Sequence, residues 1–383
     1  RRQRQMCIRD RIITALKSSV DSDSRSPIHI DTIGNLLNLG VEVFFEENIG
    51  DGINVSDKIF EQSGLKKCSR EECLKNGDLI ITNQPLGDEE LKLIKKNSTL
   101  LGMINPFSNQ KLIETCSNLK INLVSMEFIP RITRAQKMDV LSSQANLAGY
   151  VAVIESAKHL STALPMMMTA AGTLKPAKVF VIGVGVAGLQ AIATAKRLGA
   201  RVEAFDTRDV VEEQVNSLGA KFVKIDLGET GETDQGYAKE LSEDQIKKQK
   251  ELQSKVCERS DIVITTAQLF GRPAPLLIDN NTIDRMMPGS VIFDMAVESG
   301  GNVEGSEVDK VVERNGVKII GISNLASKVS NHASLALSNN YNNWILDFFD
   351  KENLKVNFDF EDEIISNSVL VHNGEIKNER FKK

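Results

Sequence analysis

The amino-acid sequence predicts an α/β protein with two domains, each built around a parallel sheet. Short apolar runs alternate with helical stretches along most of the chain, which is typical of strands joined by crossover helices. A glycine-rich turn directly follows one of these runs near the middle of the sequence. The length of 383 residues is enough for two domains that each bury a full core.

The first α/β region runs from about residue 27 to residue 139. Its strand-like segments are short and apolar, as expected for strands that are covered on both faces of a parallel sheet. They are residues 41–45, 79–82, 99–103 and 121–124. Helical stretches lie between them, so this region by itself predicts one parallel sheet.

The glycine-rich turn follows the strand-like run 178–182 and opens a helix that Gly199 ends. Gly183 permits a tight turn, Gly185 lets backbone approach a pyrophosphate, and Gly188 lets the helix pack close to the strand. The start of that helix offers unpaired N–H groups and a positive dipole end to phosphates. We therefore predict a Rossmann-like nucleotide site. Its first members are Gly183, Gly185, Val186, Ala187 and Gly188.

The next strand, residues 201–205, ends in an acid that predicts the choice of nucleotide. Asp206 follows Gly188 by eighteen positions, where a carboxylate accepts hydrogen bonds from a ribose 2′-hydroxyl and repels a 2′-phosphate. This favours NAD(H) over NADP(H). Arg208 is a group that could serve a 2′-phosphate instead, but Asp206 sits at the strand end itself. We include Asp206, Thr207 and Arg208 in the predicted cofactor site.

A set of polar residues lies upstream of the turn, on a helix that the pattern predicts from residue 133 onward. Gln136, Asp139 and Ser142 step by three and form a stripe of hydrogen-bonding groups among small and apolar residues. Such a stripe is more typical of a ligand-facing surface than of a solvated face. Strand-like segments after the turn, 260–267, 291–296 and 317–321, continue the second domain.

Three segments together resemble the NAD(H)-binding component of proton-translocating nicotinamide nucleotide transhydrogenase. They are residues 131–150, 164–173 and 181–200, and a looser similarity extends from about 27 to about 376. The resemblance implies that a helix at about 330–350 returns the chain to the first domain. We therefore predict two Rossmann-like domains, residues 1–141 plus 329–383 and residues 142–328. We expect the nucleotide in the crevice between them.

The resemblance also implies roles for individual residues. In that family an arginine, a glutamine, an aspartate and a serine hold and orient the dihydronicotinamide ring. They match Arg131, Gln136, Asp139 and Ser142. A mobile loop that closes over nucleotide with a tyrosine resembles residues 231–249. The further cofactor-binding residues that we predict there and in the loop after residue 267 are Gly236, Tyr237, Gln249 and Gln268.

The implied reaction is direct hydride transfer from NADH on this chain to NADP⁺ on a separate component. It needs proximity and ring orientation rather than a general acid or base. Asp139 is expected to pair with Arg131 and to fix the direction of the arginine. The resemblance further implies an NADP-binding component, a membrane component that moves protons, and a homodimer. This places the chain at the periphery of a membrane, on the cytoplasmic face of a bacterial inner membrane or in an organellar matrix.

Composition excludes several other classes. The net charge is −5, from 47 basic and 52 acidic residues spread along the chain, so no nucleic-acid-binding field is implied. The five cysteines and four histidines show no metal-ligand or disulfide framework. The sequence contains no run of eighteen apolar residues, so no membrane span is predicted. Residues 1–26 depart from the family, because no opening strand with a proline and a Glu-x-Arg element is found there.

Two other functions remain open. An alanine-dehydrogenase-like enzyme shares the architecture and the NAD turn, but it needs a lysine and a histidine in the first domain. The comparable strand ends here are residues 83–85 and 103–106, which supply no titratable group. A non-catalytic NAD-binding module would keep Asp206 and the glycines but would have no use for the ring-orienting set.

Overall fold

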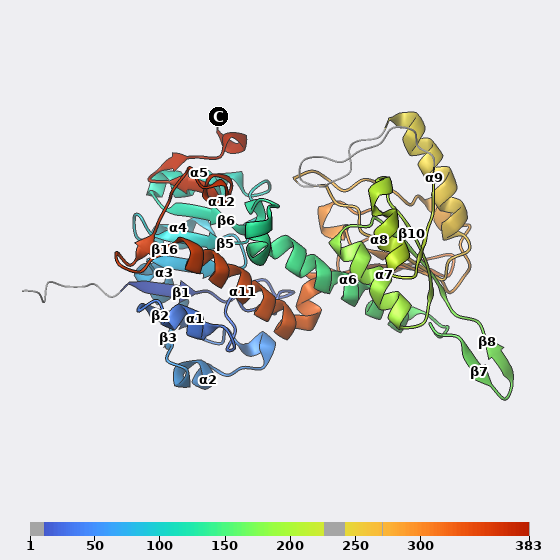
Figure 1. Cartoon of the computed structure of the whole chain (residues 1–383), viewed down its shortest axis with the longest axis horizontal. Coiled ribbons are helices and arrows are strands. Elements are labelled where there is room, and N and C mark those ends of the chain that lie inside the picture. Colours follow the sequence, from blue (N-terminus) through green and yellow to red (C-terminus); the bar gives the residue numbers. More distant parts are fainter. Residues whose placement is uncertain (1–10, 226–241, 270, 383) are drawn as a thin grey trace, which may run out of the picture. The chain divides into compact units, whose positions relative to one another are not determined.

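The computed structural model of the chain describes residues 11–225, 242–269 and 271–382 (Figure 1). The chain forms two compact units, Arg1–Gln144 with Val329–Lys383, and Ala145–Lys328. Both contain sheets made mainly of parallel strands, which confirms the predicted α/β fold. In the described ranges, no helix has the length and the apolar character that crossing a bilayer requires.

The first unit holds an eight-stranded sheet in the order β19-β18-β6-β5-β4-β1-β2-β3. The strands from β6 to β3 in that order are parallel, and β18 and β19 are antiparallel to their neighbours. The strands are β1 (Ile12–Ala15), β2 (Glu42–Glu46), β3 (Lys66–Cys68), β4 (Leu79–Thr82), β5 (Thr99–Gly102), β6 (Asn122–Ser125), β18 (Val369–His372) and β19 (Glu375–Ile376). A separate small hairpin is formed by β16 (Phe349–Asp350) and β17 (Lys355–Val356).

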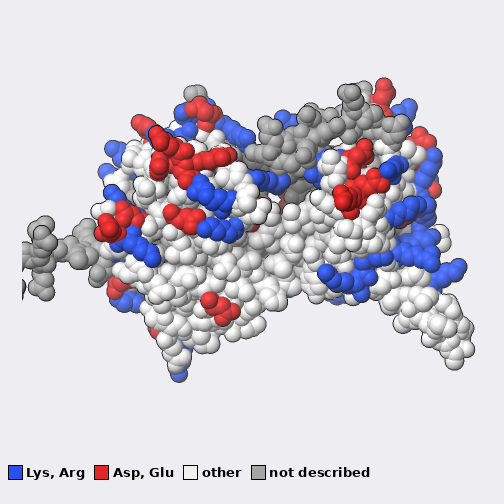
Figure 2. Space-filling view, viewed as in Figure 1, with Lys and Arg blue, Asp and Glu red and all other residues white. Residues whose placement is uncertain are grey.

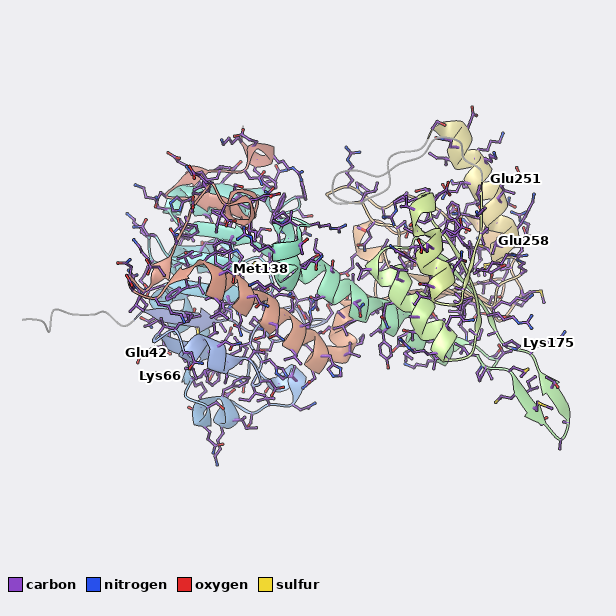
Figure 3. All side chains as sticks on the ribbon, in the orientation of Figure 1. Glu42, Lys66, Met138, Lys175, Glu251 and Glu258 are labelled. Atoms are coloured by element: carbon purple, nitrogen blue, oxygen red, sulfur yellow. The ribbon has the colours of Figure 1, made fainter. Side chains whose placement is uncertain are left out.

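The helices of this unit connect and cover the sheet (Figure 1). They are α1 (Ile33–Leu37), α2 (Asp57–Gln62), α3 (Arg70–Asn76), α4 (Asp88–Leu93), α5 (Gln110–Leu119), α11 (Ser330–Phe348) and α12 (Glu363–Ser368), with short 3₁₀ segments η1 (Asp51–Ile53), η2 (Met126–Phe128), η3 (Thr133–Met138) and η7 (Glu379–Phe381). Helix α11 is the returning helix that the sequence predicts. It inserts Tyr341 and Trp344, both fully buried, into the same core as Phe45 and Met138. Of these residues, Figure 3 labels Met138.

The expectation that residues 1–26 contain no opening strand was wrong for the part that the structure describes. Residues Ile12–Ala15 form β1, which lies between β2 and β4 near the middle of the sheet. An acid–arginine pair also follows this strand, with aspartate in place of glutamate. Arg25 donates through Nε and Nη2 to Asp23 at 2.7 and 2.8 Å, and both side chains are buried.

The second unit holds a seven-stranded sheet in the order β11-β10-β9-β12-β13-β15-β14, parallel except for β14. The strands are β9 (Lys178–Ile182), β10 (Arg201–Phe205), β11 (Lys221–Phe222), β12 (Ile262–Thr265), β13 (Val291–Asp294), β14 (Lys310–Arg314) and β15 (Val317–Gly321). The helical segments are α7 (Val186–Arg197), α8 (Glu212–Ser217), α9 (Glu243–Cys257), α10 (Asn280–Ile283), η4 (Asp209–Val211), η5 (Val297–Ser299) and η6 (Leu325–Val329), whose last residue falls in the first unit. A two-stranded hairpin, β7 (Met167–Thr169) and β8 (Gly172–Leu174), projects from this unit (Figure 1).

Each sheet contains a point where the strand order reverses. In the first unit β1 lies between β2 and β4, and in the second β9 lies between β10 and β12. Ligands of such sheets bind at the carboxyl ends of the strands beside a reversal. The carboxyl ends of β9 and β12 therefore mark one candidate site, and those of β1 and β4 mark another.

Candidate functional site

The turn after β9 has the geometry of a phosphate-binding turn. Gly183 has a φ of +96°, a conformation that side chains disfavour. Its N–H donates to the carbonyl of Phe205 at 2.8 Å, and its carbonyl accepts from the Thr266 hydroxyl at 3.0 Å. Helix α7 then begins directly after Gly185, so its amino end, where the first N–H groups have no partner within the helix, lies at the carboxyl end of β9.

The three glycines of this turn have different surroundings. A Cβ on Gly188 would lie 2.0 Å from the backbone oxygen of Gly183, and a Cβ on Gly183 would lie 2.5 Å from the Thr266 hydroxyl. These two glycines are required by packing within the protein. A Cβ on Gly185 would meet no atom within 4 Å, and Gly185 and Val186 are exposed. The outer face of the turn is therefore open at the position where backbone would approach a pyrophosphate.

Helix α6 (Val140–His159) packs tightly against the start of α7. A Cβ on Gly149 would lie 2.2 Å from the backbone oxygen of Ala187. Only glycine permits this approach, which fixes the first turn of α7 within the second unit. The turn is thus a rigid, preformed element.

Asp206 lies directly after β10 and is only 8% exposed. Its Oδ1 accepts from the backbone N–H and Nε of Arg208, both at 2.9 Å. Its Oδ2 accepts from the backbone N–H of Val184 at 2.7 Å and from Nη2 of Arg208 at 2.9 Å. A carboxylate offers roughly four acceptor positions, and all of them are used here. The acid therefore ties the end of β10 to the glycine turn.

The same contacts place Arg208 beside Asp206 rather than open to solvent. The guanidinium makes a bidentate pair with the carboxylate, and its Nη2 also lies 3.3 Å from the carbonyl of Val184. A bidentate pair of this kind is strong and fixes the orientation of both groups. Arg208 carries the positive charge that a 2′-phosphate would need, and Asp206 is the acid that a 2′-hydroxyl would need. The two charges neutralise each other in this pair.

The ring-orienting set does not lie on one continuous helix, as the sequence pattern predicted. Residues Thr133–Met138 form the 3₁₀ segment η3, the backbone turns at Asp139, and α6 begins at Val140. Asp139 caps α6, because its Oδ1 accepts from the Ser142 N–H at 2.9 Å and its Oδ2 from the Ser142 hydroxyl at 2.6 Å. Arg131 and Gln136 are exposed, whereas Ala135 and Met138 are buried.

The ring-orienting set lies in residues 131–142, which we call the polar segment. Contacts with the C-terminal part of the first unit hold this polar segment in place. The Nδ2 groups of Asn340 and Asn343 donate to the carbonyl of Lys137 at 2.9 and 3.0 Å. The Oδ1 of Asn340 accepts from the Ser143 hydroxyl at 2.7 Å. Sequence reasoning missed these residues, because about two hundred positions separate them from the segment that they support.

Two ion pairs add to this support. Nη2 of Arg134 donates to both carboxylate oxygens of Asp362 at 2.8 Å, and Nζ of Lys137 donates to Asp347 at 2.7 Å. The exposed residues of the set are therefore presented by a segment whose other side is anchored at several points. The predicted pair between Arg131 and Asp139 stays a prediction.

The remaining predicted cofactor residues fall into three groups. Gly236 and Tyr237 lie outside the described residues. Gln249 lies on α9 and is 7% exposed. Gln268 is exposed and donates through Nε2 to the carbonyl of Met295 at 3.1 Å. Thr207 follows Asp206 after the end of β10.

The carboxyl ends of β4 and β5 in the first unit are occupied by the protein itself. The Tyr341 hydroxyl lies 3.0 Å from both the Thr82 carbonyl and Oδ1 of Asn83. Oε1 of Glu127 accepts from the N–H groups of Ile104 and Asn105, both at 2.7 Å. The expectation that no titratable group borders these strand ends was thus incomplete, since the fold supplies Tyr341 and Glu127 from elsewhere. Burial raises the pKa of both groups.

The first unit also has a cavity of about 420 Å³ away from these strand ends. It lies at the amino ends of β1, β4, β5 and β6, among residues that include Asp78, Thr99 and Asn122. Because the ligands of parallel sheets bind at the opposite edge, this cavity does not mark the nucleotide site.

Comparison with known proteins identifies the family. Residues 16–148 match the model of the alanine dehydrogenase/PNT N-terminal domain, and residues 152–379 match that of the alanine dehydrogenase/PNT C-terminal domain. The chain belongs to the alanine dehydrogenase/PNT family. The polar segment falls in the N-terminal match of this family and the glycine turn in the C-terminal match.

Within the family, the chain is more similar to transhydrogenase subunits than to alanine dehydrogenases. It is 43% identical to the first part of the NAD(P) transhydrogenase alpha subunit of Rickettsia prowazekii, over 96% of each chain. It is 44% identical to the protein of that name from Rhodospirillum rubrum, over 92% of this chain and 94% of the other. Alanine dehydrogenase 1 of Staphylococcus aureus is 24% identical over 96% of this chain and 95% of its own.

Solved structures give the same ranking. A transhydrogenase from Sinorhizobium meliloti superposes with a TM-score of 0.84 at 37% identity, over 96% of this chain and 99% of that one. An L-alanine dehydrogenase superposes with a TM-score of 0.79 at 20% identity, over 97% of this chain and 98% of its own, a likeness of fold.

Proposed function

We propose that this chain is the NAD(H)-binding component of a proton-translocating NAD(P) transhydrogenase. The observation that carries the proposal is the identity of 43% with a transhydrogenase alpha subunit over 96% of both chains. The identity with alanine dehydrogenase is only 24% over a similar length. The chain would donate hydride from NADH to NADP⁺ held on a separate component.

The second unit supplies a turn that fits a dinucleotide. The open face at Gly185 and the exposed start of α7 suit a pyrophosphate, and Asp206 lies within reach of Val184 in the same turn. With all four acceptor positions of Asp206 in use, a ribose hydroxyl has to share or replace one of the contacts that Arg208 makes. Asp206 would still disfavour a 2′-phosphate by its charge.

The first unit supplies the groups that would orient the reacting ring. Bound NADH provides the hydride, and the task of the protein is to hold the donor ring in one pose. The exposed side chains of Arg131 and Gln136 would contact the nicotinamide carboxamide, which offers both a donor and an acceptor. Asp139 and Ser142 fix the start of α6 and would complete the hydrogen bonds to the ring. Rate would come from proximity and orientation, without proton transfer by a side chain.

We infer three partners for this component. An NADP-binding component would receive the hydride. A membrane component would couple the transfer to proton movement, so this chain would lie at a membrane periphery.

The third partner is a second copy of this chain. The projecting hairpin exposes Met166, Met167, Met168 and Leu174 by 40–82%, and its end carries no charged side chain in Figure 2. Such an apolar arm is typical of a subunit contact.

Titration of the purified chain with nucleotide tests the cofactor. We expect NADH to bind at least about tenfold more tightly than NADPH, as seen by nucleotide fluorescence, because a charge-assisted hydrogen bond is worth roughly 1.5–3 kcal/mol. Asp206→Asn should reduce that preference. Equal affinity of the wild-type chain for both nucleotides would contradict the role of Asp206.

Mixing the NADH-loaded chain with an NADP-binding component tests the reaction. Hydride transfer to an NADP analogue with a distinct absorbance is expected on mixing and not with either component alone. Oxidation of alanine by the chain alone would instead establish the alanine-dehydrogenase-like function. Nucleotide binding without either reaction would favour a non-catalytic NAD-binding module.

A further inference from the structure

Two cysteines outside the nucleotide site meet at the junction of β3 and α3. Cys68 is the last residue of β3, and Cys73 is the fourth residue of α3. Their sulfur atoms are 2.6 Å apart, and both are free thiols. Only four residues lie between them in the sequence, so the contact is a local property of this corner.

The start of α3 explains why the two side chains meet. Ser69 is the N-cap, and a complete capping box joins it to Glu72 through hydrogen bonds in both directions. Cys68 directly precedes this cap, and Cys73 follows it by four residues. These are the two positions where apolar side chains commonly pack together across a helix start. Here the same geometry brings two thiols together.

Neighbouring contacts hold this corner rigidly. Nη1 of Arg70, the first residue of α3, donates to Glu46 at 2.8 Å and to the carbonyl of Lys17 at 2.9 Å. Sγ of Cys68 lies 3.6 Å from the carbonyl of Phe45 on β2. On the adjoining strands, Lys66 pairs with Glu42, which Figure 3 labels. The strand and the helix are therefore fixed, and so is the approach of the two sulfurs.

The two thiols differ in access and acidity. Cys68 is half-buried, whereas Cys73 is completely buried. The hydrogen bond from Cys73 lowers the pKa of Cys68 below its usual value. The same interaction, together with burial, raises the pKa of Cys73. An accessible and more acidic thiol beside a protected one is the arrangement in which the first reacts and the second resolves the product.

We propose that Cys68 and Cys73 are a modification site that forms a reversible disulfide on exposure to a hydroperoxide. The Cys68 thiolate attacks one peroxide oxygen, the O–O bond breaks, and Cys68 becomes a sulfenic acid as water or an alcohol leaves. The Cys73 sulfur then attacks the Cys68 sulfur and releases the hydroxyl as water. Two thiols are oxidised and one peroxide is reduced. A dithiol reductant reverses the reaction by exchange.

The other described cysteines do not share these features. Cys116 and Cys257 are completely buried, and burial raises the pKa of each to about 12. Neither has a sulfur contact among the interactions found in the described ranges. Cys7 lies outside the described residues, so the test uses a Cys7→Ser background.

The experiment treats the full chain in this background with hydrogen peroxide and counts thiols after denaturation. The four remaining cysteines should all react before oxidation, and two should be lost after it. Trypsin cleaves after Lys67, Arg70 and Lys75, so the cysteines fall into separate peptides, 68–70 and 71–75. We expect these two peptides to be joined by a bond that dithiothreitol removes. The oxidation rate should rise with pH around a midpoint below the usual thiol value of about 8.5.

Single variants distinguish the site from general thiol oxidation. Cys73→Ser should leave Cys68 as a sulfenic acid that a cyclic 1,3-diketone traps, and Cys68→Ser should lose no thiol. Cys116→Ser, the matched control, should form the disulfide as the parent does. The proposal is overturned if the parent keeps four thiols, or if the joined peptides contain Cys116, Cys257 or a second chain. Circular dichroism on every variant establishes that the fold is present.

Discussion

The two sheets reverse their strand order in the same way, yet their reversal points are filled differently. Beside β9, the protein leaves the outer face of the turn open at Gly185. Beside β1, Oε1 of Gln84 accepts from the Ser18 hydroxyl and the Ser19 N–H at 3.0 and 2.8 Å. One reversal point leaves its backbone open to a ligand, and the other satisfies its donors with its own side chains.

This difference separates a binding element from a supporting one. Buried polar groups need partners, and a strand end that finds them within the protein has little left to offer a ligand. The acid at the strand ends of the first unit also has its partners within the protein. Glu127 is held by the backbone of Ile104 and Asn105, and burial raises its pKa. We therefore expect the first unit to contribute through the exposed polar segment before α6 rather than through its strand ends.

The largest expected effect comes from replacing Gly188, a glycine of the turn that packing within the second unit requires. Gly188→Ala places a Cβ 2.0 Å from the backbone oxygen of Gly183, a residue that hydrogen bonds to Phe205 and Thr266 hold in place. We expect the free energy of unfolding to fall by about 3 kcal/mol, the upper end of the usual cost of overpacking. Thermal and urea unfolding followed by circular dichroism measure the change.

Gly185→Ala is the matched variant, because its Cβ meets no protein atom within 4 Å. Its unfolding midpoint should equal that of the parent, while NADH binding should weaken about tenfold or more as the methyl group occupies the space of the pyrophosphate. If Gly185→Ala binds NADH normally, the open face is not where the nucleotide lies.

Gln136→Ala tests whether the polar segment of the first unit orients the ring. We expect NADH to bind with nearly unchanged affinity, while hydride transfer to the NADP-binding component slows roughly 100-fold, the scale of losing orientation at a reacting centre. Stopped-flow absorbance on mixing gives the rate. Thr133→Ala, an exposed change in the same 3₁₀ segment, serves as control and should transfer at the parent rate. Similar losses in both variants would contradict a specific role for Gln136.

Where burial and local pattern agree, the sequence predicted the structure closely. The runs 178–182 and 201–205 are strands with those bounds, because each is a buried, mostly apolar segment between turns. Strand β1 was missed, since it has four residues and follows a basic segment without a pattern. The strand pairs on both sides with other strands, and such tertiary pairing leaves no local signal.

The polar segment shows the same limit at the level of a site. Its residues were identified, but the break at Asp139 was not, because neither glycine nor proline marks it. The break follows from capping, since the Asp139 side chain competes for the N–H of Ser142. Its anchors on α11 are contacts between distant parts of the chain, which spacing along one sequence does not reveal.

Asn340 tests that anchoring with a smaller expected effect. Asn340→Ala removes the hydrogen bonds to the Lys137 carbonyl and the Ser143 hydroxyl, so the polar segment should sample more poses. We expect transfer to slow at least about fivefold with unchanged NADH affinity, since two hydrogen bonds are lost and each is worth roughly 1 kcal/mol. Asn339→Ala, exposed on the same helix, is the control. A lower unfolding midpoint with an unchanged transfer rate would make Asn340 purely structural.

The ion pair between Arg134 and Asp362 should give the smallest effect, and acid should abolish it. The hydrogen bond from Arg134 lowers the pKa of Asp362, so the pair stabilises the fold above the unfolded value of about 3.9 and less as the pH falls below it. Half of the Arg134 side chain is exposed, and water screens the pair. Arg134→Gln should therefore cost only about 0.2–1 kcal/mol at pH 7. Urea unfolding of both proteins should show that difference at pH 7 and a smaller one at pH 3. A difference that grows in acid would mean that Arg134 supports the polar segment through some other contact.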